Sequence, residues 1–154
     1  MKAIILTAGQ DMIGEFPACL APVGESSILS KQIGIYNNIG IEKIIVVIGN
    51  DSKCWTEIHR KYVKTLNVVV IENPKNHLTG NSYSLKMGLE KEIDDYVIIS
   101  DGDTFFDHIT ISNLINSKYD NFLLTRVSNV FTDTGTKIKL EKNKVIDIGK
   151  HINN

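Results

Sequence analysis

Short, continuously apolar runs separated by polar segments are the dominant pattern of this chain. Runs that are rich in β-branched residues and end at turn-forming residues are typical of strands buried on both faces of a parallel sheet. They predict strands over residues 3–6, 43–48, 67–71, 96–100 and 122–127. Alternating residues at 137–140 and 145–148 predict an antiparallel hairpin with one solvated face.

Apolar residues at helical spacing lie between the predicted strands. They predict helices over residues 28–39, from 52 or 53 to about 63, after a turn at 79–82 to about 91, and over 108–117. Ser26-Ser27 offers an N-cap for the first helix, and Gly40 offers a C-terminal stop. The side chains expected to face inward are Ile28, Leu29, Ile33, Ile35, Tyr36, Trp55, Ile58, Tyr62, Ile109, Ile111, Leu114 and Ile115.

Strands that alternate with helices predict an α/β fold, in which helices on both faces of a mostly parallel sheet give three layers. The length of 154 residues favours a single domain over residues 1–154. The formal net charge of -1 argues against a general nucleic-acid binder, which needs a basic face. No apolar run is long enough to span a membrane, and the start lacks the pattern of a signal peptide, so we expect a cytoplasmic protein.

The loop after the first strand is the first candidate site. A Thr7-Ala8-Gly9 turn leads into a long polar segment, Gln10 to about Glu25, that shows no regular period. The loop leaves the carboxyl edge of the predicted sheet, where ligands bind in open α/β folds. Backbone N–H groups in such a turn can receive a phosphate or the edge of a base. The alternative is a tight turn before a surface loop.

The second candidate site is Asp101-Gly102-Asp103, at the end of the fourth predicted strand. Two carboxylates at a strand end suit Mg²⁺, which can bridge the phosphates of a nucleotide. The alternative is a solvated acidic turn. Metal binding by cysteine or histidine is less favoured. Cys19 and Cys54 lack metal-like spacing and are expected to be idle thiols. The histidines form no short-spaced cluster. The chain has neither a P-loop nor a Gly-x-Gly-x-x-Gly sequence after the first strand, which argues against P-loop NTPases and dinucleotide-dependent dehydrogenases.

Several stretches resemble a known family. The sequences MKAIILTAG at 1–9, PACLAPVG at 17–24 and GIEKIIVV at 40–47 resemble the opening strand, the Pro-Lys-x-Leu-x-x-x-Gly stretch and the second strand of the sugar-nucleotide pyrophosphorylase, or NTP transferase, family. GNSYSL at 80–85 and the late hairpin are similar to the inositol-phosphate and phosphocholine cytidylyltransferase branch. The resemblance implies a Rossmann-like nucleotide-diphospho-sugar transferase fold. Because this family usually continues past the hairpin, we expect the fold to be truncated at its C-terminal end.

The resemblance also implies roles for individual residues. Backbone at Leu6, Ala8 and Gly9 would hold the base and phosphates of a nucleoside triphosphate, with CTP favoured. The turn Gly80, Asn81 and Ser82 would frame the base. Asp103 would bind the catalytic Mg²⁺, with Asp101 as an extra carboxylate beside it, and Lys150 would lie near the phosphate of the acceptor. In such enzymes a phosphorylated alcohol or sugar attacks the α-phosphorus of the nucleotide and pyrophosphate leaves.

The opening loop departs from the family pattern. Gln10–Gly14 stands where the family has a Gly-rich segment with an arginine, and Ala18 stands where the family has a lysine. Two hypotheses stay open: a short nucleotidyltransferase that forms a CDP-alcohol, and a degenerate relative that binds a nucleotide or a partner without turnover. A fragment of a longer enzyme is a third. A homodimer would cover a strand edge left open by a shortened sheet.

Overall fold

The computed structural model describes residues 1–50, 56, 58, 60–62, 67–91, 96–126 and 135–152. The chain forms two compact units, Met1–Ser112 and Asn113–Asn154, and each is described by itself. The assignment of the whole chain to a single domain stays a prediction.

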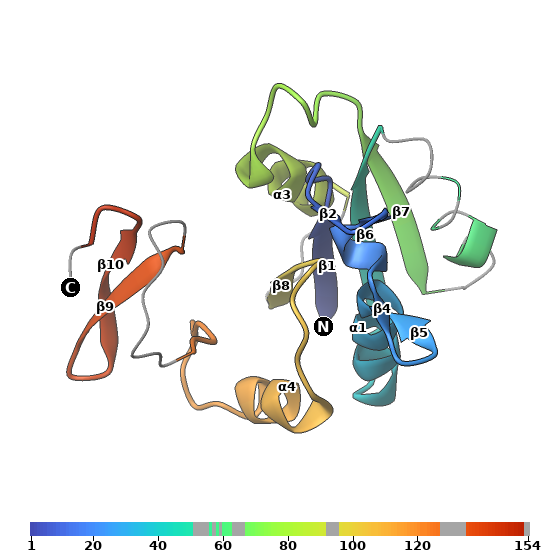
Figure 1. Ribbon diagram of the computed structural model, residues 1–154. Coiled ribbons are helices and arrows are strands. Elements are labelled where there is room, and N and C mark those ends of the chain that lie inside the picture. The colour runs from blue at the N-terminus through green and yellow to red at the C-terminus, as the bar shows by residue number, and fades with distance from the viewer. Residues whose placement is uncertain are drawn as a thin grey trace. The chain divides into compact units, whose positions relative to one another are not determined.

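A parallel sheet of four strands forms the centre of the first unit (Figure 1). Its strands are β1 (Lys2–Thr7), β6 (Lys43–Gly49), β7 (Val68–Asn73) and β8 (Val97–Asp101), in the order β7-β6-β1-β8. Ile5 of β1 pairs with Val46 of β6 and with Ser100 of β8, so all carboxyl ends lie at one edge. The predicted strands at 3–6, 43–48, 67–71 and 96–100 are therefore confirmed. Because β1 and β6 are central, their apolar runs are almost completely buried.

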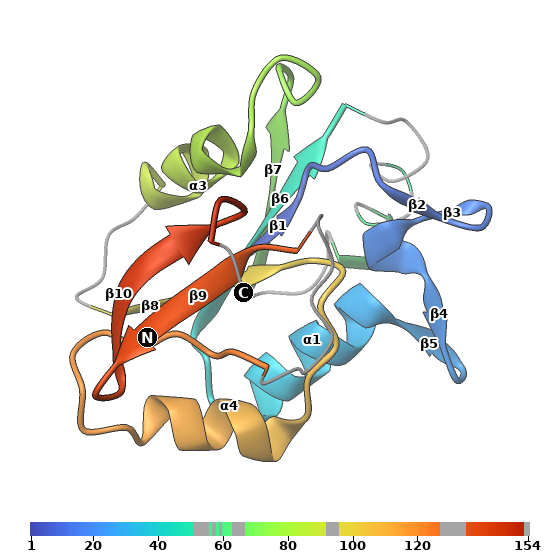
Figure 2. The same ribbon diagram turned by 60° about the vertical axis from the view of Figure 1, so that its left-hand side comes forward.

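Helices cover both faces of this sheet, as expected for an α/β fold. One face of the sheet carries Ile4, Leu6, Ile45, Val47 and Ile71, and Leu85, Met87 and Leu89 of α3 (Asn81–Leu89) pack against it. Figure 2 shows α1 (Ile28–Asn38) on the other side of the sheet from α3. A further helix, α4, spans His108–Ile115.

The predicted ends of the first helix are confirmed. Ser27 is the N-cap, and its Oγ accepts the Ser30 N–H at 3.3 Å. At the other end the Gly40 N–H donates to Asn37 O at 3.1 Å, and the Ile41 N–H donates to Tyr36 O at 2.9 Å. These two bonds satisfy carbonyls that the last turn of a helix otherwise leaves without partners.

The helix predicted from 52 or 53 to 63 is described only in part. Residues 56, 58 and 60–62 are helical, and the side chains of Ile58 and Tyr62 are buried as expected. Trp55 and Cys54 lie outside the described residues.

The opening loop is more regular than predicted. It folds into two small hairpins, β2 (Met12–Ile13) with β3 (Phe16–Pro17) and β4 (Pro22–Val23) with β5 (Ser26–Ser27), separated by the 3-10 helix η1 (Ala18–Leu20). The prediction of a segment without regular structure is wrong because strands of two residues are too short to produce a visible alternation. The Ala18 N–H donates to Asp11 O at 2.9 Å, and this bond joins the two residues that flank the first hairpin.

The predicted strand at 122–127 is wrong. Residues 122–126 have no regular structure, and Val127 lies outside the described residues. Within the described part of the chain no strand pairs with this segment, and the side chains of Phe122, Leu123 and Leu124 are 43–50% exposed. The inward orientation predicted for Ile109 is also wrong, because this side chain is 60% exposed while Ile111 of the same helix is buried.

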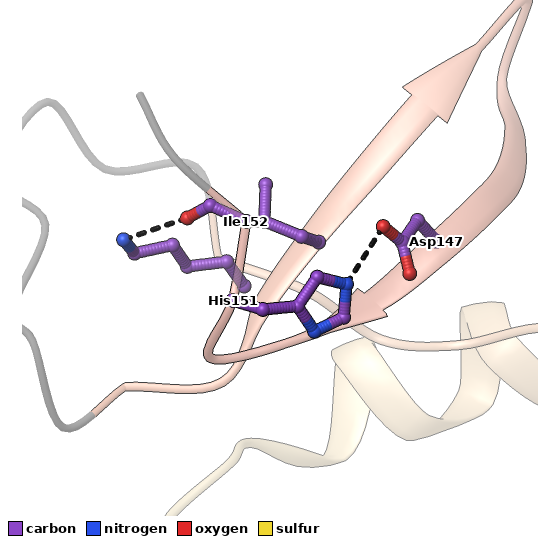
Figure 3. A network of polar contacts seen from close by, with 4 residues as sticks. Asp147, His151 and Ile152 are labelled. Atoms are coloured by element: carbon purple, nitrogen blue, oxygen red, sulfur yellow. Dashed lines mark hydrogen bonds and ion pairs between the residues drawn. The ribbon is translucent and has the colours of Figure 1, made fainter.

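The second unit contains the predicted hairpin, formed by β9 (Lys137–Glu141) and β10 (Lys144–Gly149). Lys142 and Asn143 have positive φ values of 48° and 63°, which is the geometry of a tight two-residue hairpin turn. The segment after β10 folds back onto the hairpin: the Lys137 ammonium donates to Ile152 O at 2.8 Å, and His151 Nε2 lies 3.0 Å from Asp147 Oδ2 (Figure 3). Within the described residues, the helices are all too short or too polar to cross a bilayer.

Candidate functional site

The carboxyl ends of β1 and β8 and the start of α3 surround a cavity of about 160 Å³ in the first unit. The cavity brings together Leu6, Gly9, Asn81, Asp101 and Asp103, which the sequence had predicted as site residues. Its remaining lining consists of Thr7, Asp11, Pro17, Ala18, Cys19 and Gly102. The two candidate sites of the sequence are therefore two walls of one cavity.

The other predicted site residues are not part of this lining. Ala8, which precedes Gly9 in the chain, is buried. Gly80 and Ser82 are the chain neighbours of Asn81. Lys150 belongs to the second unit, where its side chain is exposed. The structure therefore brings five of the predicted residues together and leaves these four outside the cavity lining.

The acidic turn is held closely against the first strand. The Gly102 N–H donates to Leu6 O at 2.8 Å, and the Thr104 N–H donates to Asp101 O at 3.3 Å. A side chain at position 102 would collide with the Thr7 methyl group and crowd Leu6 O, so the close approach requires glycine. This contact places Asp101 and Asp103 beside the end of β1.

The cavity has a negative electrostatic character. Burial raises the pKa of the Asp101 carboxyl above its ordinary value, and the neighbouring Asp103 carboxylate raises it further. Asp11 adds a third carboxylate to the lining, and among the described residues no arginine or lysine lines the cavity. A charged carboxylate that has lost hydration and faces a like charge is stabilised by a cation.

The donor set fits a magnesium ion that shares its coordination with a ligand. Asp101 and Asp103 supply the carboxylate oxygens that Mg²⁺ prefers, and Mg²⁺ sites commonly combine one or two carboxylates with water and phosphate oxygens. Within the described chain no group of three or more His, Cys, Asp or Glu side chains could hold a metal by itself. An ion in this cavity would therefore take its remaining ligands from water or from a bound phosphate compound.

The start of α3 is tied to the acidic turn. Gly80 is the N-cap of this helix and provides no side-chain bond to the first N–H groups. Asn81 Nδ2 lies 3.3 Å from Asp101 Oδ1, so the first residue of α3 contacts the last residue of β8. Uncapped N–H groups at a helix start attract anions or polar ligand atoms.

Two supporting residues were missed from the sequence. Asn76 Nδ2 donates to Ala8 O at 3.1 Å, and this contact is possible because Gly49 has no side chain where Asn76 passes. Gln32 is buried in α1, and its Nε2 donates to Asp101 O at 2.9 Å. Asn76 follows Asn73-Pro74, a dipeptide that by itself predicts only a turn. Gln32 does carry a signal, because it lies at helical spacing from the buried Leu29 and Tyr36.

Comparison with known proteins gives a consistent picture. A family model for the MobA-like NTP transferase domain matches residues 3–129. Choline-phosphate cytidylyltransferase of Streptococcus pneumoniae is 30% identical over 124 residues, which cover 77% of this chain and 52% of that protein. The chain thus spans about half the length of this curated relative.

Solved structures show the same fold. The inositol-1-phosphate CTP transferase from T. maritima superposes with a TM-score of 0.74 at 19% identity, covering 99% of this chain and 65% of that chain. A protein of Mycobacterium tuberculosis H37Rv solved in complex with manganese gives a TM-score of 0.54 at 18% identity, covering 75% of this chain and 57% of that chain. These likenesses confirm the predicted Rossmann-like α/β fold class, in a version shorter than its structural neighbours.

Proposed function

Because the chain belongs to the MobA-like NTP transferase domain family, we propose that it transfers CMP from CTP to a phosphorylated alcohol or sugar and releases pyrophosphate. The observation that carries this proposal is the cavity that joins the end of β1, the acidic turn after β8 and the start of α3. The names of the relatives, a choline-phosphate cytidylyltransferase and an inositol-1-phosphate CTP transferase, support CTP and a phosphorylated alcohol as the substrates.

The proposed roles combine residues that line the cavity with residues outside its lining. Backbone at Leu6, Ala8 and Gly9 holds the base and phosphates, and the turn Gly80, Asn81 and Ser82 frames the base. Asp103 and Asp101 hold Mg²⁺, which when bound supplies charge neutralisation for the triphosphate. For Lys150 the family resemblance supports only a role near the acceptor phosphate.

The chain's own contribution to catalysis is positioning. The acceptor phosphate attacks the α-phosphorus of CTP in line, a bond to the acceptor oxygen forms, and the bond to pyrophosphate breaks. No covalent intermediate with the protein is needed, so the protein acts by fixing the distance and orientation of the reactants. Because Ala18 and Asp11 line the cavity where the family pattern has cations, we expect turnover to be slow relative to relatives that keep them.

Pyrophosphate release tests this proposal. The protein is incubated with Mg²⁺, CTP and either phosphocholine or inositol 1-phosphate, and pyrophosphate is measured by an enzyme-coupled assay. Release that Asp103→Asn abolishes would support the proposal. CTP binding by calorimetry without any pyrophosphate would instead favour a nucleotide-binding module, and a lack of both across a panel of nucleotides and acceptors would refute the proposal.

A further inference from the structure

Gln32 is a buried polar residue on an otherwise apolar helix face. Its side chain is 1% exposed, and Leu29, Ile33 and Tyr36 around it are also buried. Burying an amide side chain destabilises a protein unless its polar atoms find partners. Gln32 Nε2 donates to Asp101 O at 2.9 Å and to Thr104 O at 2.5 Å, whereas Oε1 has no partner within the described residues. The Gln32 side chain therefore contributes two donated hydrogen bonds, one to each of these backbone carbonyls.

The two acceptors are the two ends of the acidic turn. The turn from Asp101 to Thr104 is closed by its own bond, Thr104 N–H to Asp101 O, at 3.3 Å, which is beyond the usual range for a strong N–H···O bond. The bond from Gly102 to Leu6 O holds only the first half of the turn. The second half, on the far side of Asp103, is tied to α1 by the Gln32 bond to Thr104 O.

A second contact from the same helix holds the segment that follows. Tyr36 lies one helical turn after Gln32, and its ring centroid is 5.8 Å from that of Phe106. Both residues are buried. Helix α1 therefore holds the segment 101–106 through the two carbonyls and the Phe106 ring. Asp103, in the middle of this segment, lines the cavity.

We propose that Gln32 is a positioning residue that sets the separation of the Asp101 and Asp103 carboxylates by bridging the ends of their turn. The geometric part of this inference, that the Gln32 amide fixes the turn, stands on the hydrogen bonds alone. Its consequence for metal affinity rests on the proposed function, in which these carboxylates hold the divalent cation. Partners that orient metal-binding groups typically change metal affinity or activity by about 10- to 100-fold when they are removed.

The variant Gln32→Met removes both donors while keeping the length of the side chain. The matched control is Ile33→Val, which shortens a buried neighbour on the same helix and leaves the turn untouched. Binding of Mn²⁺ alone is measured by the loss of the free-ion electron paramagnetic resonance signal. We expect Gln32→Met to weaken Mn²⁺ binding by about 10-fold and Ile33→Val to leave it within about 2-fold of the original protein. Equal Mn²⁺ affinity in a folded Gln32→Met protein would overturn the consequence for the metal.

Amide hydrogen exchange separates this inference from the proposed function, since it needs no metal or nucleotide. The Thr104 N–H should exchange at least about 10-fold faster in Gln32→Met, while the Ile45 N–H in the central strand should not change relative to Ile33→Val. If the original protein binds no Mn²⁺, the proposed function loses support, and the exchange rates still decide the positioning role. An unchanged Thr104 rate would overturn that role.

A measurement on the unchanged protein covers the case in which Gln32→Met does not fold. The Gln32 Nε2 protons should be strongly protected from exchange, because the side chain is buried and its amide donates to two backbone carbonyls. Rates equal to those of an exposed amide side chain would refute the inference without any variant.

Discussion

The side-chain amide of Asn81 lies 3.3 Å from Asp101 Oδ1, so the first residue of α3 contacts the last residue of β8. These residues are 20 positions apart in the chain and belong to features that the sequence presents separately, a Gly-Asn turn and an acidic turn. Their contact makes one wall of the cavity continuous. A ligand that reaches the carboxylates therefore also meets the start of α3, which is the arrangement that a metal-bound nucleotide needs.

Replacing the Asp101 carboxylate should stabilise the protein at neutral pH. The pKa of Asp101 is raised, first by burial and then by Asp103, so the folded protein holds this proton to a higher pH than the unfolded chain. The penalty is absent below the unfolded pKa, grows as pH rises from the unfolded pKa to the raised folded pKa, and is complete above the folded pKa. Asp101→Asn should thus raise the melting temperature at pH 7 by about 1–2 °C, a small shift because solvent screens a largely exposed group.

The thermal measurement is repeated at pH 3, where the carboxyl is protonated in the original protein. The advantage of Asp101→Asn should shrink or vanish there. An advantage of the same size at both pH values would show that the raised pKa of Asp101 is not its cause.

A methyl group at position 102 should loosen the acidic turn. In Gly102→Ala the new Cβ would overlap the Thr7 methyl group and lie 3.1 Å from Leu6 O, which is backbone and cannot move aside alone. Overpacking of this kind costs about 1–3 kcal/mol. The free energy of unfolding is measured by urea denaturation. Gly34→Ala is the control, because nothing lies within 4 Å of its Cβ, and alanine in a helix interior should stabilise by about 0.5–1 kcal/mol.

The central strands could be predicted from the sequence because their signal is local. The apolar runs around Ile5 and Val46 are buried on both faces. A short continuous apolar run that is rich in β-branched residues is typical of a buried strand. The stretch at 122–126 also begins with an apolar run, Phe122-Leu123-Leu124, but has no strand beside it among the described residues. Strand formation depends on a partner that the run itself does not specify, and for this reason the local signal was misleading there.

The carboxylates and the glycine turn of the site could also be predicted, because they follow strands directly. The residues that support them could not. Gln32 bonds to a carbonyl 69 positions later, and Asn76 bonds to a carbonyl 68 positions earlier. Both acceptors are backbone carbonyls. Every residue has one, so the residue type at the acceptor position gives no sign of the bond. Only the position of Gln32 among buried apolar residues distinguished it from an ordinary exposed glutamine.

Asn73 should be one of the most stabilising polar residues of the first unit. It is completely buried at the end of β7, and its Nδ2 donates to Thr79 Oγ1 at 3.1 Å and to Ser84 Oγ at 3.0 Å. Its Oδ1 accepts the Lys75 N–H at 2.9 Å. Asn73→Ala removes these three hydrogen bonds, and we expect a loss of about 1–3 kcal/mol in the free energy of unfolding.

Urea denaturation measures this loss, and Asn38→Ala provides the comparison. Asn38 is exposed at the end of α1, so its removal should change the unfolding free energy by no more than about 0.5 kcal/mol. Similar losses for the two variants would mean that the bonds of Asn73 contribute little net stability.

Restoring a cation to the opening loop should strengthen nucleotide binding. Ala18 lies in η1, is 8% exposed, and lines the same cavity as the acidic turn. In Ala18→Lys we expect the ammonium to reach the triphosphate in the cavity and to offset the carboxylate of Asp11. We expect the affinity for CTP with Mg²⁺, measured by calorimetry, to rise about 10-fold, the effect of one charge-assisted hydrogen bond. Ala18→Met has the same reach without the charge and should not improve binding, and because the gain is electrostatic it should fall as salt is raised. If Ala18→Met improved affinity as much as Ala18→Lys, the gain would come from packing, and the loop would have no role in holding phosphate.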